Sequence, residues 1–488
     1  MSQVQQPRRR FSRWERILLG LFVFTLPLVN PWVRGDGVGY YAYARSLLIE
    51  RHLNFEKDWQ HGNESFVMGQ VGPDGRVLPS EYTSTGHIAN IWSIGPSLLW
   101  APFLVVTHAG VLLVDQMGAH VSADGFSAPY LITMAVATSF YGFLSLWISF
   151  YLARKYFEER WAFLATLGIW WASSLPVYMY FNPSWSHAHS AFVVALFLWY
   201  WHRTRTARTL PQWILLGVLS GLMVNVYYPN GVVLLVPVME AISSYWKEWN
   251  ASAHGGPAIP RLFVRHLIYL GTFVVALLPT LISRQIIFGS PTNTGYTPVR
   301  GWAWHSPAFW SVLFSSDHGL LSWTPILILA LVGLAWFHRV DQRFATYLTV
   351  VFVAFYVLIS LHPDWDGLSS YGSRFFVSLT PLFVLGLAAF FEWLGRAWHG
   401  RRSTAAAWTM VAVPIVWNLG LVYQWGTHLI PARGPISWRA AAYNQVAVVP
   451  EQAVSTMKSY LTRRGKLMDR IEREDVKQIK SQRPEGTE

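Results

Sequence analysis

The sequence predicts an all-α polytopic membrane protein with about eleven transmembrane helices. Three observations predict this class. The 488 residues are 52% hydrophobic and only 13% charged, whereas soluble domains carry roughly a quarter charged residues. Apolar runs near 20 residues recur along the chain, which is the length that crosses a bilayer. The 27 tryptophans fit the same class, because indole favours the boundary between lipid and water.

The first apolar run, 17–33, follows five arginines and precedes no small-residue cleavage site. It therefore predicts a retained span with a cytoplasmic N-terminus. Further runs complete the set of predicted spans, which are 17–33, 128–154, 161–181, 186–202, 211–228, 230–246, 266–288, 320–337, 344–361, 375–395 and 405–425.

The stretch Ile94 to Val114 is also apolar, and it decides the topology. If it spans, every later basic loop moves to the outside. If it lies in the outer interface, the basic loops are all cytoplasmic, as the positive-inside rule requires. Pro96 and Pro102 also favour a broken surface helix. We therefore expect 34–127 to be one outer loop, 1–425 to be a transmembrane domain, and 426–488 to be an outer tail with a surface helix.

The net charge of +12 does not indicate nucleic-acid binding, because the basic residues lie between apolar runs as orientation signals do. The chain has no cysteine, so disulfide and thiolate chemistry are excluded. Membrane lipids are the expected surroundings, and a bacterial-type cytoplasmic membrane is the expected location.

The most informative stretch is 34–45, which directly follows the first span. Asp36 lies there between Gly35 and Gly37, where the chain leaves lipid for water. Glycines on both sides allow a tight turn and a close approach by another molecule. The alternative is an acidic helix cap at a membrane exit.

This stretch and two others resemble a known family. The acidic residue after the first span, followed by Tyr40-Tyr41-Ala42-Tyr43, resembles the opening of the C-type membrane glycosyltransferases. The segment 94–103 is similar to a Pro-containing interfacial helix of their protein mannosyltransferase and lipid A aminoarabinose transferase branch. The segment from Phe126 to Phe157 resembles the element that follows. The resemblance covers about the first half of the chain.

The resemblance implies transfer of a sugar from a polyprenyl-phosphate donor to a lipid, glycan or protein acceptor. It also implies that the acid at position 36 is the general base of an inverting reaction on the outer face. The alternatives are a polymerase or ligase of lipid-linked glycans and a multi-pass transporter. The chemistry itself needs one carboxylate to accept the hydroxyl proton and cationic donors for the leaving phosphate.

Arg374 is the expected phosphate ligand, because its planar fork matches phosphate oxygens and it stands alone at a membrane boundary. The alternative is snorkelling to lipid headgroups. The family often has a second acid near 181–189, but this chain has none there, and His187 stands near that position. His187 is therefore a second candidate for the donor phosphate, with a helix-start residue as the alternative.

The remaining candidates line the substrate or bind a metal. No cofactor is expected to be required, and a divalent cation is the alternative, because Asp364 and Asp366 form a D-x-D pattern. The expected substrate-lining residues are Tyr40, Tyr41, Glu56, Asp58, His189 and Tyr371.

Overall fold

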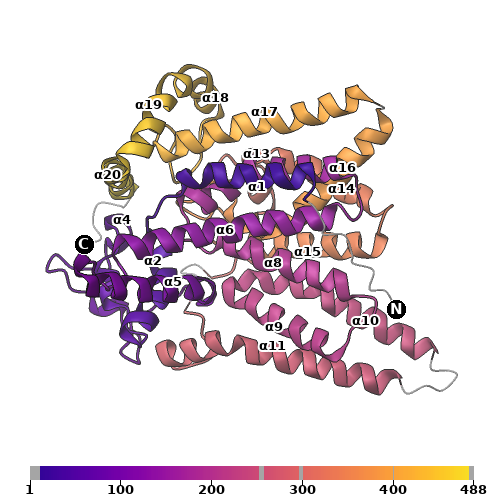
Figure 1. Ribbon diagram of the computed structural model, residues 1–488, viewed down its shortest axis with the longest axis horizontal. Coiled ribbons are helices and arrows are strands. Elements are labelled where there is room, and N and C mark those ends of the chain that lie inside the picture. Colours follow the sequence, from indigo (N-terminus) through magenta and orange to yellow (C-terminus); the bar gives the residue numbers. More distant parts are fainter. Residues whose placement is uncertain (1–10, 252–257, 296–300, 399, 483–488) are drawn as a thin grey trace.

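The computed structural model describes residues 11–251, 258–295, 301–398 and 400–482. Within these ranges the chain is helical, with isolated β-bridges and no β-strand. Figure 1 shows long helices that run side by side across the molecule, with short helices gathered at one end. The prediction of an all-α membrane protein is confirmed.

Most of the long helices begin and end within about six residues of a predicted span. The helices in the predicted spans 17–33 and 161–181 end 8 and 10 residues early, and the helix in 266–288 begins 8 residues early. The long helices are α1 (Arg13–Thr25), α6 (Ala128–Ala153), α7 (Glu159–Trp171), α8 (His187–Thr204), α9 (Leu210–Val226), α10 (Leu235–Ala251), α11 (Ala258–Phe288), α14 (Ile326–Phe337), α15 (Gln342–Ser360), α16 (Thr380–Ala397) and α17 (Arg401–Gly426). Six helical segments of the described chain are long and apolar enough to cross a membrane, and one of them is Gly95–Ala119. The total of eleven spans stays a prediction.

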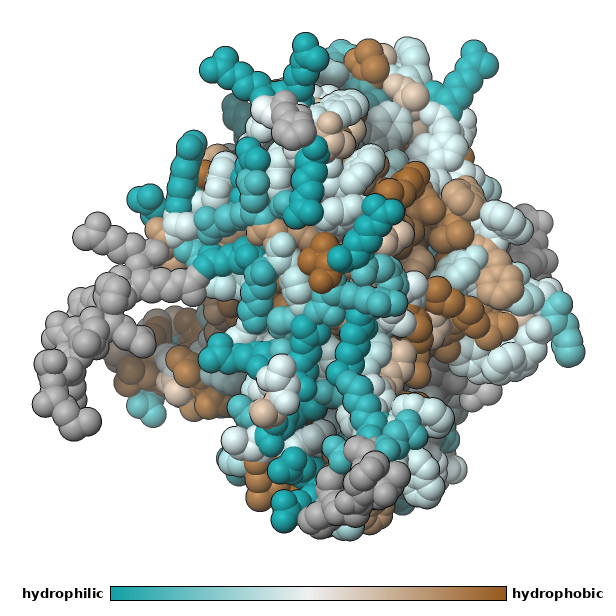
Figure 2. Space-filling model, turned by 90° about the vertical axis from the view of Figure 1, so that its right-hand side faces the viewer, coloured by the Kyte–Doolittle hydropathy of each residue, from teal (hydrophilic) through white to brown (hydrophobic). Residues whose placement is uncertain are grey.

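One end of the bundle is rich in arginine, and we call it the basic end. Glu15 at the start of α1 accepts a hydrogen bond from Arg154 after α6 at 2.8 Å, so these two helices share this end. Arg205 pairs with Asp341 there at 2.6 Å and ties the loop after α8 to the start of α15. Figure 2 looks onto this end and shows many hydrophilic side chains across it.

The opposite end, which we call the site end, holds the first loop. Its helices are α2 (Asp36–Arg45), α3 (Glu56–Gln60), α4 (Glu64–Val67) and α5 (Gly95–Val114). The chain after α5 returns to the elements before it. Tyr41 donates to the carbonyl of Gly125 at 2.7 Å, and the ring of His61 stacks on Phe126. The predicted loop 34–127 therefore starts and ends at the site end, although composition alone marks Gly95–Ala119 as a span.

The prediction that prolines break the helix in the 94–114 stretch is wrong. Helix α5 continues through Pro102 without interruption. Pro102 is exposed on the surface of α5. Val106, one turn further along α5, is 72% exposed, and such exposed apolar side chains suit contact with lipid.

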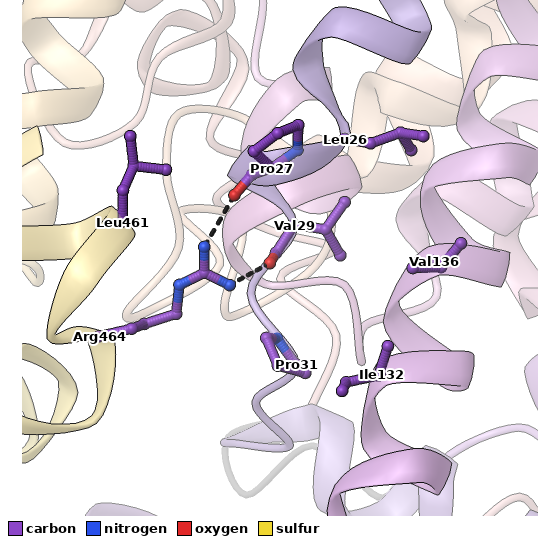
Figure 3. A pocket seen from close by; sticks show the side chains of 8 residues that line it. All are labelled: Leu26, Pro27, Val29, Pro31, Ile132, Val136, Leu461 and Arg464. Carbon is purple, nitrogen blue, oxygen red and sulfur yellow. Dashed lines mark hydrogen bonds between the residues drawn. The ribbon is translucent and has the colours of Figure 1, made fainter.

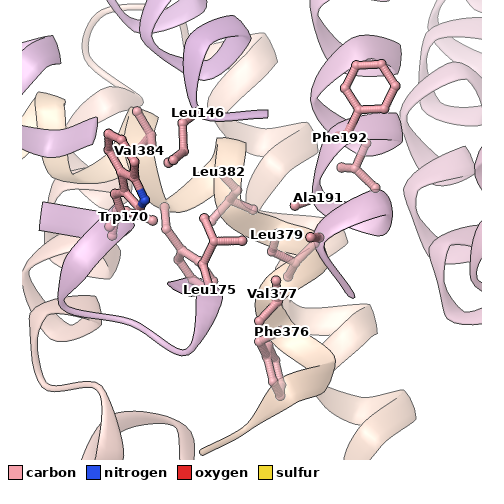
Figure 4. Close-up of a cluster of buried hydrophobic side chains, with 14 of the residues drawn as sticks. Leu146, Trp170, Leu175, Ala191, Phe192, Phe376, Val377, Leu379, Leu382 and Val384 are labelled. Carbon is pink, nitrogen blue, oxygen red and sulfur yellow. The ribbon is translucent and has the colours of Figure 1, made fainter. Parts of the chain in front are cut away.

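The core is centred on α16, which is the most deeply buried of the long apolar helices. Figure 4 shows part of this core, in which Leu382 and Val384 pack with Leu146, Trp170 and Leu175. A 3₁₀-helix, η8 (Arg374–Leu379), leads directly into α16. The best-packed helix of the bundle therefore fixes the position of Arg374 at the site end.

The tail forms α18 (Trp438–Ala447), α19 (Val449–Thr462) and α20 (Arg464–Gln482). It folds back over the end of α1. Figure 3 shows Arg464 donating to the carbonyls of Pro27 and Val29, at 2.7 Å for Pro27, beside a surface hollow of about 370 Å³. These contacts hold the tail at the site end, where α20 lies beside α4 (Figure 1).

Candidate active site

Asp36 and Arg374 form an ion pair at the site end. Nη1 of Arg374 donates to Oδ2 of Asp36 at 2.5 Å. The Asp36 side chain is 30% exposed and the Arg374 side chain 12% exposed, so the pair is sheltered but the carboxylate can still be reached. The two strongest candidates from the sequence are thus in direct contact.

The local sequence explains how Asp36 is placed. Gly35 is the N-cap of α2 and has a φ of 52°, a conformation that other residues adopt only with strain. A Cβ on Gly37 would lie 1.9 Å from the Ser184 hydroxyl oxygen, so only glycine lets α2 approach the 182–185 turn. Asp36 is the first residue of the helix, where the helix dipole favours a negative charge.

Arg374 is held by an aromatic ring on one side and keeps one donor without a partner. Its guanidinium lies 4.6 Å from the centre of the Trp185 ring, in a cation–π contact. Its Nε is buried and has no hydrogen-bond partner among the described residues. A buried donor without a partner is costly, so an anion that accepted from it would be bound favourably.

The pair lines a polar cavity of about 240 Å³. Arg34 and Arg433 also line this cavity. Next to it lies a larger, mostly apolar cavity of about 600 Å³ between α17 and the tail helices. The two cavities share wall residues, which are Arg34, Asn182, Ser369, Ala432 and Asp475. A polar chamber and an apolar one therefore adjoin at this shared wall, and Asp36 and Arg374 line the polar one.

The other predicted contacts of the first loop lie away from this cavity. The Tyr40 hydroxyl accepts from Ser186 at 3.0 Å, and Tyr41 donates to Gly125. Asp58 is buried and takes two hydrogen bonds from Arg45, at 2.6 and 2.7 Å. Glu56 is half-buried in α3. Asp58 therefore has a structural partner of its own, and none of these four lines the polar cavity.

The two histidines are buried behind the cavity wall. His187 packs among the rings of Tyr178, Trp185 and Tyr227. His189 packs against Trp100. Neither lines the polar cavity, although Trp185 joins His187 to Arg374 through its ring.

The loop before Arg374 holds the remaining candidates. Tyr371 is buried and donates to the Asn418 side chain at 2.8 Å, which fixes the loop. The backbone carbonyl of Asp366 accepts from His318 at 2.9 Å. Asp364 and Asp366 belong to no group of three or more histidine or acidic side chains that could hold a metal in the part of the chain described here.

Burial and the nearby Asp366 raise the pKa of Asp317 to about 6. Asp317 adjoins His318, whose pKa burial lowers to about 4. Both groups lie in the loop between α12 (Phe309–Phe314) and α13 (Leu320–Trp323). The loop thus contains two side chains whose charged forms are both disfavoured near pH 5.

Sequence analysis missed three charged residues of the cavity wall, which are Arg34, Arg433 and Asp475. Arg34 stands two residues before Asp36, and this proximity in the sequence could have indicated that it lines the same cavity. Arg433 and Asp475 come from the tail, 59 and 101 residues after Arg374 respectively by their numbering, and no local pattern marks them. Asp475 pairs with Arg34 at 2.5 Å.

Comparisons with known proteins place the chain only by its fold. No family model matches it, and no curated protein matches it. Two solved structures are similar. Arabinosyltransferase EmbB from Mycobacterium smegmatis is 11% identical with a TM-score of 0.49, and the similarity covers 97% of this chain but 40% of EmbB. ArnT from Cupriavidus metallidurans is 14% identical with a TM-score of 0.46, covering 95% of this chain and 77% of ArnT.

This chain spans less than half the length of EmbB. At such identities the similarity concerns only the course of the backbone.

Proposed function

We propose that the protein transfers a sugar from a polyprenyl-phosphate donor to an acceptor hydroxyl at the site end. The observation that carries this proposal is the Asp36–Arg374 pair, which faces a polar cavity adjoining an apolar one. A donor with an anionic, sugar-bearing head and a hydrocarbon tail has the same two-part chemistry. The distant similarity to an arabinosyltransferase is in line with it.

In the proposed reaction Asp36 accepts the proton of the acceptor hydroxyl. The hydroxyl oxygen forms a bond to the anomeric carbon of the sugar. The bond between that carbon and the phosphate oxygen breaks, and its electron pair leaves with the phosphate. One displacement of this kind inverts the anomeric centre. A positioned base and a cation at the leaving group are the two contributions that such a step needs.

Arg374 has to serve both the carboxylate and the phosphate. In the structure its Nη1 is used by Asp36, while its Nε has no partner in the described chain. A phosphate that takes the guanidinium draws it away from Asp36. We propose that donor binding thereby frees the carboxylate to act as a base, so that the base is released only when a donor is present.

The apolar cavity is the proposed place for the polyprenyl chain. Its lining comes mainly from α17, α19 and α20, with residues such as Leu419, Val422, Ala453, Met457 and Leu467. Burying a hydrocarbon chain there contributes about 25 cal/mol per Å² of apolar surface.

The charge distribution supports an outer location for the site. Arg154, Arg205 and Arg208 lie at the basic end, and basic loops face the cytoplasm in membrane proteins. The site end would then face away from the cytoplasm.

A ligase that transfers a lipid-linked glycan is the second candidate. One observation favours it: Arg34, Arg374 and Arg433 all line the polar cavity, and a diphosphate carries more charge than a monophosphate.

The purified chain in liposomes tests the proposal with a panel of polyprenyl-monophosphate sugars and polyprenyl-diphosphate glycans. We expect transfer from a monophosphate donor, release of polyprenyl phosphate, and an inverted anomeric centre in the product by NMR. We expect a chelator to leave the rate unchanged. A retained anomer would contradict the mechanism, transfer only from diphosphates would favour the ligase, and sugar uptake without transfer would favour a transporter.

A further inference from the structure

Helix α20 crosses the turn that presents Asp36. Glu472, Asp475 and Gln478 are spaced by three residues, so they lie along one face of this helix. Asp475 and Gln478 line the polar cavity, and Glu472 contacts the first loop. The tail therefore contributes one polar stripe to the site.

Asp475 holds the residue two positions before Asp36. Nη2 of Arg34 donates to Oδ2 of Asp475 at 2.5 Å, and Nε2 of His428 lies 2.8 Å from Oδ1. Burial alone would raise the pKa of Asp475, but Arg34 and His428 outweigh it and leave this pKa below its usual value. The guanidinium of Arg34 also lies 4.5 Å from the centre of the Trp32 ring.

Glu472 holds the residue directly before Asp36, through one intermediate. Oε1 of Glu472 accepts from Nδ2 of Asn63 at 2.9 Å and from the backbone of Ser65 at 2.7 Å. Oδ1 of Asn63 accepts from the backbone N–H of Gly35 at 3.0 Å. The chain of contacts runs from α20 to the glycine whose left-handed conformation starts α2.

We propose that α20 is a brace for this turn, and that Glu472 and Asp475 are positioning residues for Asp36. The proposal rests on the function proposed above. Helix α20 holds Arg34 directly and Gly35 through Asn63, and residues 31–35 before α2 form no helix or strand that would fix them otherwise. A displacement of about 1 Å in a reacting group costs on the order of 100-fold in rate, so a loosened turn would slow transfer without removing any group that touches the substrate.

The test compares the Glu472→Ala variant with two other variants of the same helix. Glu472→Gln keeps an oxygen that can accept from Asn63 and Ser65, and should rescue most of the activity. Glu474→Ala is the matched control, because Glu474 is 45% exposed on the same helix and pairs with Lys477 of that helix. We expect Glu472→Ala to lower kcat by roughly 10- to 100-fold with donor KM nearly unchanged.

Hydrogen exchange of the full-length variants gives a readout that does not depend on catalysis. The backbone N–H of Gly35 is bonded in the structure and should exchange faster in Glu472→Ala and in Asp475→Ala, but not in Glu474→Ala or Glu472→Gln. Unchanged exchange at Gly35 in both alanine variants would overturn the brace. Faster exchange with parental kcat would overturn the positioning role. If even the parent transfers no sugar, the proposed function fails, while the exchange data still decide whether α20 holds the turn.

Discussion

Arg374 donates to Asp36 at 2.5 Å across 338 positions of the sequence. The arginine is anchored by the most buried of the apolar helices, and the carboxylate by a turn that only glycine allows. Two residues singled out separately in the sequence therefore form one unit. Their roles as phosphate ligand and base are linked, because any anion that binds the arginine competes with the carboxylate.

Arg374→Ala should weaken use of the lipid donor more than it weakens folding. Loss of a hydrogen bond to a charged group costs about 1.5–3 kcal/mol, or roughly 10- to 150-fold in affinity. Donor KM in the transfer assay measures this. Arg76→Ala is the control, because Arg76 is 85% exposed in the first loop. A parental donor KM in Arg374→Ala would mean that the arginine serves only the fold or the headgroup region.

Ala453→Trp should narrow the apolar cavity, because Ala453 lines it from α19. We expect a higher KM for a long-chain donor and little change for a donor with a very short tail, since only the long tail needs that space. Ser455→Trp, at an exposed position of the same helix outside the cavity lining, is the matched control. An equal rise in KM for both donors would place the tail elsewhere.

The topology can be tested by cysteine labelling, since the chain has no cysteine. Ser122 and Glu158 are both exposed and lie at the two ends of α6. An impermeant reagent added outside the cell should label Ser122→Cys and spare Glu158→Cys. The reverse pattern would make α5 a true span and invert every later loop.

Asp317 and His318 should make opposing contributions to the pH dependence of folding stability. The pKa of Asp317 is raised to about 6 in the folded state, so the protonated side chain stabilises the fold at low pH. This stabilisation is complete below the pKa of the unfolded state and is lost as the pH rises through 6. The pKa of His318 is lowered to about 4 in the folded state, so the neutral side chain stabilises the fold at higher pH. This stabilisation is complete above the pKa of the unfolded state and is lost as the pH falls toward 4. The two effects oppose each other between about pH 4 and 6.

Asp317→Asn removes one of these opposing contributions. Its melting temperature should therefore rise more steeply with pH than that of the parent between about pH 4 and 6. A variant whose melting temperature follows the parental slope would show that Asp317 does not titrate in this window.

Much of the fold was predictable because lipid imposes long apolar runs and a biased placement of arginine. Hydropathy marks α5 as a span, and the basic loops argue against it, so the surface position of α5 stays a prediction. The contact between Tyr41 and Gly125 shows that the chain after α5 returns to the site end. Asp36 and Arg374 were found because each stands out locally at a membrane boundary. Arg433 and Asp475 were not, because their roles depend on how the tail packs back onto the bundle.

Asp58 shows that the sequence alone does not tell a structural carboxylate from a catalytic one. It lies in the same loop as Asp36 and has the same chemistry, but its buried pair with Arg45 makes it part of the fold. For this reason it is a poor control for a catalytic variant. Asp74, which is 63% exposed, is a better one.

The turnover of Asp36→Asn tests the central claim most directly. The amide keeps the shape of the side chain and removes its basicity, and general-base catalysis is worth about 10²- to 10⁴-fold. We predict a fall in kcat of that order with donor binding largely preserved, while Asp74→Asn keeps the parental rate. An Asp36→Asn protein that transfers sugar at the parental rate would contradict the assignment of Asp36 as the base.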